Sequence, residues 1–67
     1  MCKEVEELRQ LQARLCFFRC KIYKFEIYRS EQQLKGTKNT IEYADKNIKA
    51  YEAAANTCLN RIGQLIG

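Results

Sequence analysis

The chain has 67 residues, which allows one small domain spanning residues 1–67 and no second one. Charged residues make up 30% of it and hydrophobic residues 46%, a balance that excludes an intrinsically disordered chain. A chain this short is only marginally stable alone and is usually reinforced by disulfides, a metal or association with another chain. It contains no proline and only three glycines, which favours long uninterrupted helices over a turn-rich β fold.

The first predicted helix runs from about residue 3 to residue 35. Apolar residues recur along it at alternating spacings of three and four, so they share one side of the helix, as the a and d positions of a heptad do. We call this set the heptad face: Leu8, Leu11, Leu15, Phe18, Ile22 and Phe25. Lys35 suits the C-terminal end of the helix, and Gly36 is expected directly after it in the left-handed conformation.

The same helix carries a second apolar stripe, rotated by about 135° from the heptad face. We call it the outer stripe: Val5, Cys16, Cys20, Tyr23, Ile27 and Leu34. A surface helix ordinarily has one apolar side, and one neighbouring helix covers only one side. The outer stripe is either a second contact, made with another chain, or a set of simply exposed residues. We expect the contact; which of the two stripes faces the second helix stays open at this point.

The connection is predicted at residues 36–39, with Asn39 capping the next helix and Glu42 as its reciprocal partner, or with Thr37 as the alternative cap. The second helix is predicted over about residues 40–65. Its apolar residues keep the same spacing without a break: Ile41, Ala44, Ile48, Tyr51, Ala55, Cys58, Ile62 and Leu65. So short a connection joins antiparallel neighbours. The predicted fold is therefore all-α, an antiparallel two-helix hairpin that associates into a four-helix-type bundle or packs on a partner, with Phe25 level with Tyr51.

The cysteines allow more than one interpretation. Cys16 and Cys58 are expected at nearly the same level of the hairpin, so a disulfide between them requires Cys16 to face the second helix. Cys2 lies about 21 Å along the helix from Cys16, and the chain has no histidine, so the four ligands of a structural zinc site are not available. We expect buried or half-buried free thiols, no metal and no cofactor.

The net charge of +4 is concentrated on the first helix. One side of it, which we call the basic sector, carries Arg14, Lys21, Lys24 and Lys35, with Phe17 and Tyr28 between them. Basic residues with interleaved aromatics can bind phosphates and stack on bases. They can equally be a solvated surface or bind an acidic protein. No recognisable nucleic-acid-binding motif accompanies them.

Nothing in the chain points to catalysis, since histidine is absent, Ser30 is the only serine and no glycine-rich phosphate loop is present. We expect a non-enzymatic protein–protein interaction module, such as a small adaptor, co-chaperone or inhibitor. Its predicted partner-binding residues are Phe17, Cys20, Tyr23, Ile27 and Tyr28. The expected partner is a second copy, as a dimer, or a heterologous helical protein; nucleic-acid binding by the basic sector is the alternative. With no secretory signal pattern and no run of about 20 apolar residues, a cytoplasmic location is expected.

Overall fold

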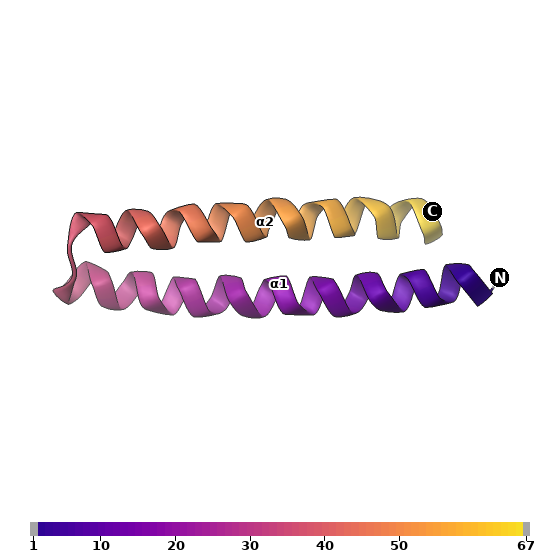
Figure 1. Ribbon diagram of the computed structural model, residues 1–67, viewed down its shortest axis with the longest axis horizontal. Helices are drawn as coiled ribbons and strands as arrows, with labels where there is room; N and C mark the ends of the chain where they lie inside the picture. Colours follow the sequence, from indigo (N-terminus) through magenta and orange to yellow (C-terminus); the bar gives the residue numbers. More distant parts are fainter. Residues whose placement is uncertain (1, 67) are drawn as a thin grey trace.

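The protein is a helical hairpin. The computed structural model describes residues 2–66, which form two α-helices, α1 (Cys2–Lys35) and α2 (Lys38–Ile66). The helices lie side by side and antiparallel, so the start of α1 and the end of α2 lie at one end of the rod and the connection lies at the other (Figure 1). The rod measures 51 × 14 × 13 Å. The predicted all-α antiparallel hairpin is confirmed, with helix ends within two residues of the predicted ones.

The connection is shorter than predicted because Thr37, and not Asn39, caps α2. The Thr37 N–H donates to Thr40 Oγ1 (3.1 Å) and the Thr40 N–H donates to Thr37 Oγ1 (3.4 Å), which is the reciprocal pattern of a capping box. The Thr40 hydroxyl also donates to the Thr37 carbonyl oxygen at 2.8 Å. Helix α2 therefore begins at Lys38, and Glu42, the predicted reciprocal partner, lies 4.0 Å from the Lys38 ammonium instead.

Gly36 is required for space and not for a left-handed backbone. No glycine in the described part of the chain has a positive φ, so the predicted conformation of Gly36 is wrong. Its N–H instead donates to the Gln32 carbonyl oxygen at 2.7 Å, which continues the helical pattern for one more residue. A Cβ at this position would lie 2.7 Å from Thr40 Oγ1 and 2.8 Å from the Gln32 Cβ. A side chain there would therefore displace the cap of α2.

The core is a single seam between the helices, formed on the α1 side by the heptad face. Leu11 of that face is buried and its other members are half-buried. The buried residues of α2 are all small, namely Ala44, Ala55 and Cys58. Small residues opposite large ones allow the helices to approach closely without leaving voids. The heptad face therefore forms the seam with α2, whereas the residues of the outer stripe remain exposed.

An aromatic ladder extends the seam toward the connection. The Tyr51 ring lies 6.1 Å from Phe18 and 6.0 Å from Phe25, on which it stacks at 23°. Tyr43 makes edge contacts with Phe25 at 6.0 Å and with Tyr28 at 6.4 Å. Each such pair contributes about 0.5–1.5 kcal/mol beyond the area it buries. The predicted level of Phe25 beside Tyr51 is confirmed.

Two ion pairs fix how far one helix is shifted along the other. Arg29 donates to Asp45 toward the connection. At the opposite end of the rod from the connection, the Arg61 guanidinium donates two hydrogen bonds to the Glu7 carboxylate, from Nε to Oε1 at 2.7 Å and from Nη2 to Oε2 at 3.2 Å. The hydrogen bond from Arg61 lowers the pKa of Glu7 and raises that of the guanidinium. The four side chains of these two ion pairs are partly exposed, so each pair contributes little to the free energy of unfolding. Their main effect is to align the two helices.

Candidate protein-interaction face

The outer stripe is exposed on the side of α1 that faces away from α2. Leu34 has 91% of its surface exposed, Ile27 63% and Tyr23 62%. Cys16 and Cys20 are also exposed. The helix geometry explains this, because a stripe about 135° from the heptad face cannot reach the helix that the heptad face contacts. Within the chain, α1 therefore has more apolar surface than α2 covers.

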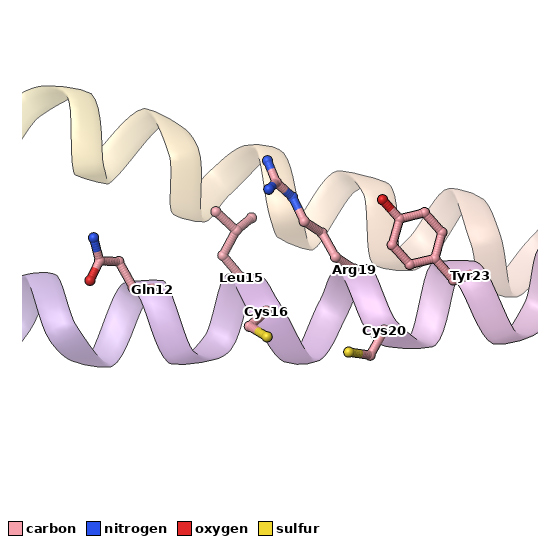
Figure 2. Close-up of a pocket in the computed structure, with 6 residues that line it drawn as sticks. All are labelled: Gln12, Leu15, Cys16, Arg19, Cys20 and Tyr23. Carbon is pink, nitrogen blue, oxygen red and sulfur yellow. The ribbon is translucent and has the colours of Figure 1, made fainter.

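A groove of about 420 Å³ lies along α1 between the heptad face and the outer stripe (Figure 2). Its lining comes entirely from α1: Gln12, Leu15, Cys16, Arg19, Cys20 and Tyr23. In Figure 2, Arg19 and Tyr23 extend from one side of the helix and the two cysteines from the other. The groove is wide open, so it offers no enclosed site for a small molecule.

The cysteines divide into two classes. Cys58 is buried in the seam, as expected, whereas Cys16 and Cys20 are exposed, so the expectation of buried or half-buried thiols is wrong for these two. All three are free, and the Cys16–Cys58 disulfide is not formed because Cys16 faces away from α2. The side chain of Cys2 lies outside the described residues. In the described part of the chain, no three potential metal-ligating side chains come together.

The predicted partner-binding residues occupy two neighbouring sides of α1. Cys20, Tyr23 and Ile27 lie together in the outer stripe. Phe17 is 53% exposed on the adjoining side, next to the basic sector, and its ring lies beneath the Lys21 ammonium at 5.5 Å from the centroid. Tyr28 is half-buried against Tyr43, so contacts within the hairpin already occupy part of its ring.

The basic sector is largely open to solvent. Arg14, Lys24 and Lys35 are exposed, and Lys21 is half-buried over Phe17. The ion pairs found among residues 2–66 involve other basic residues. The sector therefore keeps its positive charge along one side of α1, beside the apolar face.

Sequence reasoning missed three residues that line the groove: Gln12, Leu15 in this role, and Arg19. Gln12 and Arg19 lie between the two stripes, where a search for apolar periodicity assigns nothing, and that search assigns Leu15 to the heptad face alone. The signal that could have found them is spacing, because residues three, four and seven positions apart are neighbours on a helix surface. Arg19 follows Cys16 by three residues and precedes Tyr23 by four, so it borders both of them.

Across residues 2–66, neither helix has a segment with the length and apolar character needed to span a membrane. Comparison with protein-family models gives no match, and no curated protein and no solved structure matches the chain significantly.

Proposed function

We propose that this protein is a non-enzymatic protein–protein interaction module whose outer stripe packs against a helix of another chain. The observation that carries the proposal is the exposed area. The chain has 5381 Å² of accessible surface, whereas a compact monomer of 7.9 kDa exposes about 4,400 Å². The excess of about 1,000 Å² is close to the roughly 800 Å² that one partner contributes to a standard interface.

The distribution of exposed apolar residues indicates which side is the interface. Among the residues whose exposure the structure describes, half of the exposed large hydrophobic residues belong to the outer stripe: Val5, Tyr23, Ile27 and Leu34. An apolar surface of this kind, bordered by polar residues, is typical of a contact with another protein. The groove beside Cys16 and Cys20 adds a concave place for a partner's side chains. A small adaptor, co-chaperone or inhibitor acts through such a contact alone, with no chemistry of its own.

The test replaces the centre of the outer stripe with charge. Tyr23→Asp combined with Ile27→Asp leaves the seam intact, because both side chains are exposed. The double variant is expected to stay helical by far-UV circular dichroism and to lose association. The matched control is Leu59→Asp combined with Ile66→Asp, two exposed apolar residues of α2, which is expected to associate like the wild type. Two results together would overturn the proposal: the wild type stays monomeric, and it binds no helical protein in a way that the Tyr23→Asp, Ile27→Asp variant abolishes.

Nucleic-acid binding is the second candidate, favoured by the exposed charges of Arg14, Lys24 and Lys35 on one side of α1. We rank it second because Lys21 covers the Phe17 ring within the chain, which leaves that ring less free to stack on a base. Binding to phosphates weakens steeply as salt is added. A gel shift at low salt, lost on reversing the charge of Lys21 and Lys24, would establish this function; no retardation at low salt would exclude it.

A further inference from the structure

The part of the outer stripe from Cys16 to Leu34 belongs to a regular row of positions on α1, whose intervals alternate between three and four in either direction. Leaving out Val5, which lies outside this row, and adding the exposed residues Ala13 and Ser30 gives seven positions at alternating intervals of three and four. We call them the outer row: Ala13, Cys16, Cys20, Tyr23, Ile27, Ser30 and Leu34. Tyr23 is the middle member of the row. Each member on one side of Tyr23 has a counterpart on the other side at the same distance along the chain, to within one residue. A helix with such a row is matched in register by an antiparallel copy of itself.

We infer that the occupant of the outer stripe is the outer row of a second copy of this chain, antiparallel to the first, with the two-fold axis at Tyr23. The inference rests on the proposed function and names its partner. Reversal about Tyr23 places Leu34 opposite Ala13 of the second copy and Ile27 opposite Cys20 of the second copy. A two-fold pair uses the same surface on both chains, so each contact occurs twice.

Side-chain size supports this register. The two most exposed large hydrophobic members of the row, Leu34 and Ile27, each meet a small exposed residue of the second copy, while Tyr23 meets Tyr23 of the second copy at the axis. Cys16 meets Ser30, whose hydroxyl already donates to the Glu26 carbonyl oxygen at 3.0 Å, so burying it leaves that donor satisfied. The seam within the hairpin uses the same pattern, with large residues of α1 against small ones of α2.

Charge supports the same arrangement. Arg19 and Glu26 are exposed along one edge of the outer row, and neither takes part in an ion pair found among residues 2–66. In the antiparallel pair with its axis at Tyr23, Arg19 of one chain lies within one residue, along the helix axis, of Glu26 of the second copy. The two-fold symmetry gives two such pairs. The other edge brings Lys24 near Lys24 of the second copy. Added salt therefore screens an attraction and a repulsion together, and the association depends only weakly on salt.

A parallel pairing is less favourable on the same surface. It would set Leu34 against Leu34 and Ala13 against Ala13, so crowded and empty layers would follow each other. It would also bring Arg9, which lies in line with the outer row, against Arg9 of the second copy. In the antiparallel pairing Arg9 lies beyond the end of the second copy's α1, which stops at Lys35.

The first test mixes two charge variants of the full chain under reducing conditions. Arg19→Glu places like charges opposite each other in its own dimer, and so does Glu26→Arg; each is expected to weaken self-association about tenfold. When the two are mixed, every such position faces an opposite charge, so a heterodimer of about wild-type affinity is expected. Sedimentation velocity measures the three species, and far-UV circular dichroism confirms that each variant is helical.

The second test reads the register directly with Ser30→Cys. Under a glutathione redox buffer, two thiols give up two electrons and two protons to oxidised glutathione and become one disulfide. The inference predicts a disulfide between the new thiol and Cys16 of the second copy, identified by peptide mapping. The wild type, with Cys16 opposite Ser30 and Cys20 opposite Ile27, is expected to form no disulfide between Cys16 or Cys20 of the two chains.

The outcomes separate this inference from the proposed function. Heterodimer rescue together with the disulfide between Cys16 and position 30 supports both. A wild-type dimer that shows no rescue, or that links Cys16 to Cys16, overturns the antiparallel register and leaves the proposed function standing. A wild-type monomer that binds another helical protein through Tyr23 overturns the second copy as occupant. A monomer with no such partner overturns both.

Discussion

Glycine-to-alanine substitution at two sites should change stability in opposite directions. At position 63 the added methyl meets nothing within 4 Å and the residue is helical, so Gly63→Ala gains helix propensity worth up to about 1 kcal/mol. At position 36 the methyl would lie 2.7 Å from Thr40 Oγ1, an atom of the α2 cap. Losing that cap costs about 1–2 kcal/mol, partly offset by about 0.4–1 kcal/mol from a stiffer unfolded chain.

The two substitutions are therefore expected to differ by about 2 kcal/mol. For a chain of this length, each 1 kcal/mol shifts the melting temperature by about 4–8 °C. Thermal melts followed by far-UV circular dichroism, at one fixed chain concentration, measure both shifts. Gly63→Ala should melt above the wild type and Gly36→Ala below it. A Gly36→Ala variant as stable as the wild type would show that the close contact with the cap is not what requires glycine there.

Three further predictions concern the seam, the ion pair and the thiols. Tyr51→Ala removes the ring that both Phe18 and Phe25 contact and should lower the free energy of unfolding by about 2–4 kcal/mol in a urea titration, whereas Tyr51→Phe should change it little. Folding lowers the pKa of Glu7, so its ion pair with Arg61 stabilises the protein above the ordinary glutamate pKa, and this stabilisation is lost as the pH falls through the pKa of Glu7 in the folded protein. Glu7→Gln should remove this contribution to the loss of stability in acid, measured by unfolding at a series of pH values. In dilute protein, alkylation should modify the exposed thiols at once and the buried Cys58 only on unfolding; equal rates would contradict the seam.

The seam could be predicted because helical rotation alone determines which residues share a side. Leu11, Phe18 and Phe25 are separated by whole heptads, so no tertiary information is needed to place them on one face. The same reasoning placed Tyr23 and Ile27 about 135° away, and the structure leaves them exposed. The sequence could not decide which stripe contacts α2, because both have the spacing of a helix–helix contact.

The connection and the contacts between helices could not be predicted to the same detail. Thr37 and Asn39 both have side-chain oxygens that can cap a helix, and the choice depends on how closely the chain folds back at Gly36. The pair between Glu7 and Arg61 joins residues far apart in the chain. Predicting it requires the relative shift of the two helices to within about one residue, because one residue moves a side chain by about 1.5 Å along the axis and 100° around it.

The most direct test of the account is the mass of the full chain in solution across a range of concentrations, under reducing conditions. The account predicts a mass that rises toward twice 7.9 kDa with concentration, and that stays at 7.9 kDa for the Tyr23→Asp, Ile27→Asp variant. A wild type that remains at 7.9 kDa at every concentration, and that binds no helical protein through Tyr23, would contradict it.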